Sequence, residues 1–141
     1  MKPAFALIVV NLFISVFAVA IPPAPTAANA VARPPVQALT PEELASAIKA
    51  GKWLIVEFGG ERCIPCMHMQ PVLQDLRDAL ETKAIIRNFW IQEHPDVARQ
   101  HKIMVMPTQI IFNPQGEEAL RHMGYFPPGE FQAALQKLGI L

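Results

Sequence analysis

A short, almost wholly apolar run at residues 53–58, WLIVEF, constrains the fold of this chain more than any other feature. Apolar strand formers without polar alternation are typical of a strand that is covered on both faces of its sheet. Apolar residues at helical spacing follow this run, namely Met69, Val72, Leu73, Leu76 and Leu80. A second apolar run occupies residues 84–91. The pattern predicts an α/β fold in which helices flank a central sheet.

The remaining segments complete the expected order of elements. Thr40, Pro41 and Glu43 form the signature of a capped helix start. Pro71 lies inside the helical period that follows the first strand, so it predicts a kink and not an end. We expect helix, strand, helix, strand, short helix, hairpin and helix, with the last three near residues 95–101, 108–123 and 129–138. This order indicates a single domain built on a mixed sheet.

The first 39 residues differ in composition from the rest of the chain. Lys2 precedes an apolar stretch at residues 4–21, and small residues that suit cleavage follow. We expect residues 1–30 to be a signal peptide, with an uncleaved inner-membrane anchor at 4–21 as the alternative. Residues 31–39 are rich in Pro and Ala, which predicts a linker, and residues 40–141 form the expected domain. The expected location is the periplasm, either soluble or anchored.

The charge of the chain excludes one class of function. Twelve basic and twelve acidic residues leave no formal net charge. A nucleic-acid-binding protein usually carries an excess of positive charge, and this sequence has none. We expect no nucleic-acid partner, and contact with a membrane only if the N-terminal segment is retained.

The two cysteines of the chain, Cys63 and Cys66, are separated by Ile64 and Pro65. A disulfide between them closes a very short loop, so it stabilises the fold little as a staple. The pair stands between the first strand and the amphipathic helix, where the helix N-terminus favours thiolate over thiol. In a redox reading, Cys63 is the attacking thiolate, and Cys66, one turn deeper, is the resolving thiol.

Metal binding is the main alternative use of the cysteines. A structural zinc site needs four ligands, and a c-type haem site needs histidine directly after the second cysteine. Neither pattern is present, so no resident cofactor or metal is expected. Soft ligands at Cys63, Cys66, Met67, His68 and Met69 leave a Cu(I) metallochaperone as an open alternative.

The chain resembles the thioredoxin superfamily, specifically its exported bacterial thioredoxin-like members, over residues 40–141. The motifs that carry the resemblance are IVEF at 55–58, CIPC at 63–66, Pro71, MPT at 106–108 and Gly124. The resemblance implies a thioredoxin-like fold and thiol:disulfide exchange with protein thiols and disulfides. It also implies a reversible Cys63–Cys66 disulfide.

Further site residues follow from the same resemblance. Pro107 is expected to be cis and to face the cysteines, which leaves the Met106 backbone free to pair with an extended substrate. The expected substrate-binding residues are Arg62, Ile64, Pro65, Met106, Pro107 and Thr108. Glu57 matches a buried acid that relays protons to the resolving cysteine, with its pKa raised by burial. The alternative for Glu57 is a place at the sheet margin, in contact with water.

Departures from the family pattern bear on the direction of electron flow. Arg62 replaces a usual tryptophan, and Ile64 and Pro65 replace Gly-Pro between the cysteines. Strong oxidases of the superfamily carry a histidine there that holds the thiolate, so its absence favours a reductase of the cell envelope. Such proteins receive electrons from a membrane donor and act on apocytochromes or misoxidised proteins. A non-catalytic thioredoxin-fold binding module is a further alternative.

Overall fold

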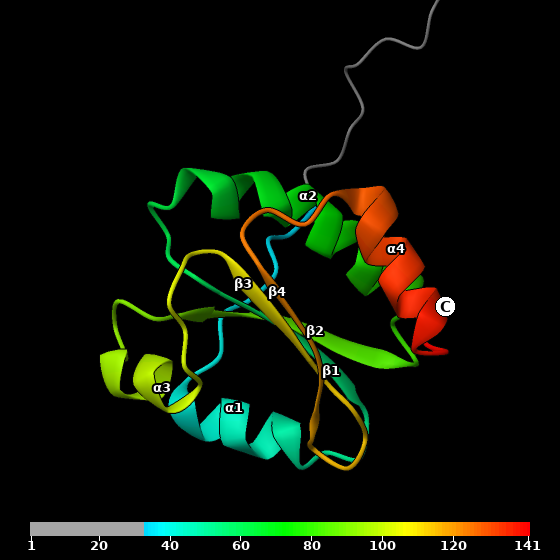
Figure 1. Cartoon of the computed structure of the whole chain (residues 1–141), viewed down its shortest axis with the longest axis horizontal. Coiled ribbons are helices and arrows are strands. Elements are labelled where there is room, and N and C mark those ends of the chain that lie inside the picture. The colour runs from blue at the N-terminus through cyan, green and yellow to red at the C-terminus, as the bar shows by residue number, and fades with distance from the viewer. Residues whose placement is uncertain (1–32) are drawn as a thin grey trace, which may run out of the picture. The chain divides into compact units, whose positions relative to one another are not determined.

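A computed structural model describes residues 33–141 of the chain, which form one folded unit (Figure 1). The expected signal peptide at 1–30, its alternative as an anchor at 4–21, and the first two residues of the expected linker lie outside the described residues. Within residues 33–141, no helix combines the length and the apolar character needed to cross a bilayer.

Four strands form one mixed sheet with the order β2-β1-β3-β4. The strands are β1 (Trp53–Gly59), β2 (Ala84–Trp90), β3 (Thr108–Phe112) and β4 (Glu118–Met123). The helices are α1 (Pro41–Ile48), α2 (Ile64–Ala79), α3 (Pro95–Gln100) and α4 (Pro128–Lys137). β1 pairs in parallel with β2 and antiparallel with β3, which in turn pairs antiparallel with β4. The predicted α/β fold with a mixed sheet is confirmed.

Helices cover both faces of the sheet, as Figure 1 shows: α2 and α4 lie on one side and α1 and α3 on the other. Alternate residues of β1 point to opposite faces, so Ile55 packs towards α2 and α4 while Leu54 packs towards α1. Both residues are fully buried. The apolar run that opened the sequence argument is therefore the central strand of the domain.

Residues 33–39 differ from a free linker. Val36 is buried against the core, and Ala38 forms a parallel bridge with Asn88 of β2. Leu39 N–H donates to the Asn88 carbonyl at 2.8 Å, and Asn88 N–H donates to the Gln37 carbonyl at 2.9 Å. This short stretch belongs to the folded unit because its backbone completes the outer edge of β2.

Local signals in the sequence set the helix ends. The Thr40 hydroxyl accepts a hydrogen bond from Glu43 N–H, and the Glu43 carboxylate accepts one from Thr40 N–H, which completes a capping box at the start of α1. α2 continues through Pro71, so the prediction that this proline does not end the helix is confirmed. The start of α2 is the point at which β1 delivers the two cysteines, and it positions the site.

Candidate active site

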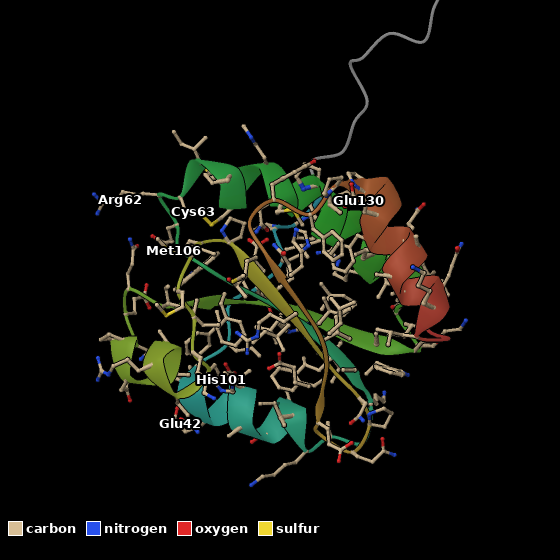
Figure 2. The ribbon with its side chains drawn as sticks, viewed as in Figure 1. Glu42, Arg62, Cys63, His101, Met106 and Glu130 are labelled. Atoms are coloured by element: carbon tan, nitrogen blue, oxygen red, sulfur yellow. A yellow bond between two sulfur atoms is a disulfide. The ribbon has the colours of Figure 1, made fainter. Side chains whose placement is uncertain are left out.

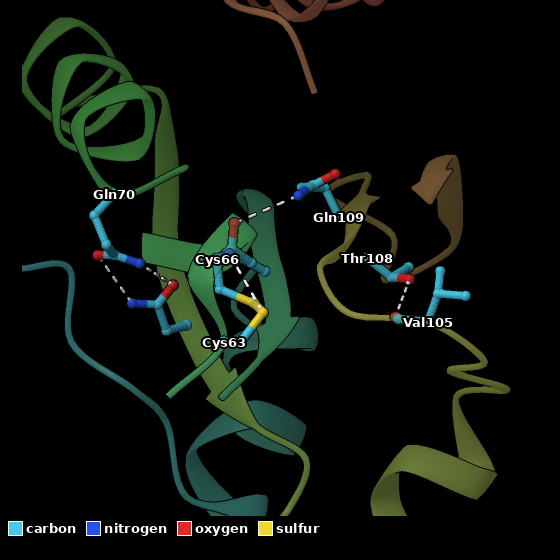
Figure 3. The surroundings of a disulfide bond; sticks show 8 residues. Cys63, Cys66, Gln70, Val105, Thr108 and Gln109 are labelled. Atoms are coloured by element: carbon cyan, nitrogen blue, oxygen red, sulfur yellow. Dashed lines mark hydrogen bonds between the residues drawn. A yellow bond between two sulfur atoms is a disulfide. The ribbon is translucent and has the colours of Figure 1, made fainter. Parts of the chain in front are cut away.

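Cys63 and Cys66 form a disulfide at the junction of β1 and α2 (Figure 3). The two Cα atoms lie 5.2 Å apart. Cys63 occupies the N-cap of α2, and its sulfur accepts a hydrogen bond from the Cys66 backbone N–H at 3.3 Å. Cys63 is half-buried, whereas Cys66 is only 1% exposed. A partner therefore reaches the first sulfur and not the second.

Gly59 allows Cys66 to approach β1. A β-carbon on this residue would stand 2.9 Å from Cys66 Sγ, closer than such atoms approach, and 3.6 Å from Glu57 Oε1. The sulfur and the carboxyl oxygen therefore border the same small space beside β1. The absence of a side chain at Gly59 brings a proton-binding group and the deeper cysteine together.

Glu57 is fully buried, so the alternative of a margin carboxylate in water is wrong. Burial raises the pKa of Glu57 to about 8, because the charged form loses its water, and a hydrogen bond from Gln109 opposes this shift. Gln109 Nε2 donates to Glu57 Oε2 at 3.4 Å (Figure 3). A group with this pKa exchanges protons near neutral pH, as a general acid or base requires.

The loop before β3 supplies the facing side of the site. The Met106–Pro107 peptide bond is cis, as the family resemblance implied. Thr108 is 1% exposed, and its hydroxyl donates to the Val105 carbonyl at 2.8 Å. The Thr108 side chain therefore holds the loop, and the substrate-binding role of this residue stays a prediction. Figure 2 shows Arg62, Cys63 and Met106 at the same end of the domain.

Exposed apolar side chains accumulate on the segments that carry the site. Ile64 is 63% exposed, and Pro65 and Arg62 beside it are also exposed. The other large apolar side chains exposed on the flanking segments are Met67, Met104, Val105, Met123 and Tyr125. Gly124 N–H donates to the Pro107 carbonyl at 2.7 Å, which ties the end of β4 to the cis-proline loop. The surroundings of Cys63 suit an apolar polypeptide partner.

The predicted soft-ligand cluster is divided by the fold. Met69 is fully buried in the core, and its sulfur accepts a hydrogen bond from Phe126 N–H at 3.3 Å. Met67 and His68 are exposed on the helix. In the part of the chain that the structure describes, no three His, Cys, Asp or Glu side chains gather as a metal site would require. Met69 therefore acts as a core residue.

Two polar residues flank Glu57, and sequence reasoning missed the first of them, Gln109. Gln109 lies inside β3, directly opposite Glu57 in the register, and is fully buried. Asn88 lies opposite Glu57 on the other side, in β2. The Asn88 side-chain amide donates to the Val36 carbonyl at 2.7 Å and also bonds to Gln70. The available signal for Gln109 was its polar side chain inside an otherwise apolar strand.

Comparison with known proteins decides the family. Residues 40–139 match the family model described as a thioredoxin-like domain. The chain belongs to the thioredoxin-like family. The thioredoxin of Alicyclobacillus acidocaldarius is 32% identical over 97 residues, which cover 69% of this chain and 91% of that protein. The thioredoxin of Staphylococcus epidermidis is 31% identical over 99 residues, which cover 70% of this chain and 93% of that protein.

Solved structures agree with this family. Oxidised mitochondrial thioredoxin 3 from Saccharomyces cerevisiae superposes with a TM-score of 0.65 at 25% identity, covering 72% of this chain and 94% of the yeast chain. Plasmodium falciparum thioredoxin superposes with a TM-score of 0.65 at 23% identity, covering 72% and 98%, and shows the shared fold. This thioredoxin-like protein, with its disulfide-bonded CxxC pair, is a thiol-disulfide oxidoreductase that acts on protein thiols and disulfides.

Proposed function

We propose that this thioredoxin-like protein works as a protein-disulfide reductase of the cell envelope. In the reducing direction, the Cys63 thiolate attacks a substrate disulfide, forms a mixed disulfide and releases one substrate thiolate. Cys66 Sγ then attacks Cys63 Sγ, which restores the Cys63–Cys66 bond and releases the second substrate thiolate. The substrate gains two electrons, and the protein pair loses them.

The support for the reducing direction is the small number of groups placed around Cys63 Sγ that could stabilise a thiolate there. Within residues 33–141, the Cys66 backbone N–H is the only group that donates a hydrogen bond to Cys63 Sγ. Ile64 and Pro65, between the cysteines, carry neither a charge nor a side-chain donor. Strong oxidants of this chemical class depend on a stabilised thiolate, which favours their reduced form. Weak stabilisation makes the dithiol a better electron donor.

Glu57 is the proposed proton relay of the exchange. When Cys66 attacks, its thiol proton passes to the Glu57 carboxylate, and the proton returns when the disulfide is reduced again. The common space beside Gly59 and the raised pKa of Glu57 support this role.

The proposed location and electron source are supported by the N-terminal sequence. An apolar stretch at 4–21 after Lys2 suits export through the membrane, with residues 1–30 cleaved or retained as an anchor. An exported reductase needs a donor for its oxidised pair, and we propose a membrane electron-transfer protein. A fusion of residues 1–39 to alkaline phosphatase tests export, since this reporter is active only outside the cytoplasm, and an inactive fusion contradicts it.

The reduction potential of the Cys63–Cys66 pair tests the direction. Equilibration with glutathione buffers should give a potential near that of thioredoxin, about −270 mV, and not near the about −120 mV of strong oxidases. A value close to the strong oxidases contradicts the reductase proposal. An insulin-reduction assay tests catalysis itself: Cys63→Ser should abolish turnover, and a wild-type protein without turnover indicates a binding module.

A further inference from the structure

Gln109 of β3 is the polar partner of the buried acid. Gln109 and Glu57 face each other in the antiparallel register, and both are 0% exposed. Asn88, on the opposite flank of Glu57, directs its amide to Val36 and Gln70. Within the described residues, Gln109 is therefore the only side chain that hydrogen-bonds to Glu57. One amide controls the polar environment of this carboxyl group.

Two oxygens of this pair have no hydrogen-bond partner among residues 33–141, namely Glu57 Oε1 and Gln109 Oε1. A buried oxygen without a hydrogen-bond donor is unfavourable. A fixed orientation of the Gln109 amide therefore suits only one of the two protonation states of Glu57. An ionised Glu57 accepts the amide N–H of Gln109 but has no hydrogen to offer. A protonated Glu57 has an O–H, which Gln109 Oε1 accepts if the amide turns over.

We propose that Gln109 is a positioning residue that keeps Glu57 hydrogen-bonded in both protonation states by reversing its amide as the proton moves. The proposal rests on the relay role proposed for Glu57. When Cys66 Sγ loses its proton to the Glu57 carboxylate and bonds to Cys63 Sγ, the new Glu57 O–H donates to Gln109 Oε1. The disulfide-bonded structure shows the ionised arrangement, in which Gln109 Nε2 donates to the carboxylate. This arrangement returns whenever Glu57 gives up its proton, to Cys66 during reduction or to water.

The other groups around Glu57 form no hydrogen bond to its carboxyl group in the described part of the chain. α2 contributes the titratable Cys66, β2 contributes the uncharged Asn88, and α4 contributes apolar side chains to this face. His122 of β4 lies opposite Gln109 in the register, so it is the further titratable group on this row. Its Nε2 atom lies 3.0 Å from the Tyr125 carbonyl, and its ring stacks on Phe126 at 3.8 Å.

NMR titration of the whole purified protein tests the proposal, through the Glu57 carboxyl carbon and the Gln109 side-chain amide. In the wild type, the amide resonances should shift with the same midpoint as the Glu57 carboxyl. Gln109→Met keeps the length of the side chain but removes the donor. We expect the Glu57 midpoint to rise by about one pH unit, because a hydrogen bond to the ionised form is lost.

The pH dependence of the resolving step, in which Cys66 attacks Cys63, should change in the same direction as the Glu57 titration. In single-turnover experiments, the pH midpoint for release of substrate from Cys63 should rise with that of Glu57. Gln109→Asn keeps an amide, so its midpoint should lie between those of the wild type and Gln109→Met. Two controls should keep the wild-type midpoint: Ile111→Val, on the same face of β3, and His122→Phe, which removes the titratable ring but keeps an aromatic one for Phe126.

Two results would overturn the role of Gln109. The first is a wild-type amide whose resonances do not follow the Glu57 titration, and this measurement needs no variant. The second is a Gln109→Met protein in which the Glu57 midpoint stays at the wild-type value or falls. The NMR titration requires no turnover, so failure of insulin reduction rejects the proposed function separately.

Discussion

The two faces of the sheet differ in chemistry although the same strands build both. The face covered by α1 and α3 packs Leu54, Val56 and Phe58 of β1 into an apolar core. The face covered by α2 and α4 has its own apolar core but also carries Glu57, Asn88 and Gln109 in one row, beside Cys66. One face serves stability, and the other combines stability with proton and sulfur chemistry.

The comparison shows how a small domain separates these demands. Buried polar groups lower the stability of a fold unless they are hydrogen-bonded. Here the polar row lies toward the carboxyl end of β1, next to the start of α2. The buried polar side chains that lower stability are therefore confined to the neighbourhood of the cysteines. The following variants test that separation, from the largest expected effect to the smallest.

Leu54→Ala tests the apolar face. Leu54 is fully buried against α1, and removal of its side chain should lower the free energy of unfolding by about 2–5 kcal/mol. Insulin reduction per folded molecule should remain at the wild-type level because Leu54 lies at the far end of β1 from the cysteines. Denaturant unfolding and activity on the same sample measure both. A tenfold loss of specific activity would show that the faces are not separate.

Glu57→Gln tests the polar face through the pH dependence of stability. Folding raises the pKa of Glu57 from 4.5 to about 8, so the folded protein retains a proton that the unfolded chain loses. Wild-type stability should therefore fall as pH rises from about 4.5 to about 8. Glu57→Gln, which has no such proton, should gain roughly 2–4 kcal/mol relative to wild type between pH 5 and pH 9.

Denaturant unfolding of the Glu57→Gln variant at several pH values measures this gain. Glu81→Gln is a suitable control because Glu81 lies on the exposed surface just after α2. A constant difference between Glu57→Gln and wild type across the pH range would contradict the buried, protonated state of Glu57.

Gly59→Ala tests the close approach on the polar face. The added β-carbon meets Cys66 Sγ at 2.9 Å, so the cysteine has to shift, and turnover should fall by about tenfold. Gly129→Ala is the matched control, because nothing lies within 4 Å of its added carbon. Single-turnover kinetics of both variants measure the effect. Equal rates for the two variants would show that the position of Cys66 next to β1 is not needed.

Thr40→Ala should have the smallest effect of the series. It removes the hydroxyl of the capping box of α1, which should lower the free energy of unfolding by about 1 kcal/mol. The redox potential and turnover should remain unchanged, since α1 covers the apolar face. A changed potential would indicate that the apolar face also influences the disulfide.

The strands and helices were predictable because the period of their apolar residues is local. The run at 53–58, the hairpin at 108–123 and the helix through Pro71 all appear where the pattern placed them. The start of the folded unit was harder to predict from the sequence. Residues 33–39 have no period, and they are held to the domain by contacts with distant residues, such as the bridge of Ala38 to Asn88 and the burial of Val36.

The site was partly predictable for the same physical reason. The cysteines and the cis-proline are marked by short motifs, and the burial of Glu57 follows from its place in an apolar strand. The pairing of Glu57 with Gln109 has no local mark, because the two residues are brought together only by the register of β1 and β3.

Trapping of the mixed disulfide tests the assignment of the two sulfurs most directly. Each single serine variant is reduced, mixed with a disulfide-bonded substrate protein and separated on a non-reducing gel. Cys66→Ser should accumulate a covalent complex through the accessible Cys63, whereas Cys63→Ser should form none because Cys66 is only 1% exposed. A complex that accumulates with Cys63→Ser and not with Cys66→Ser would contradict the account.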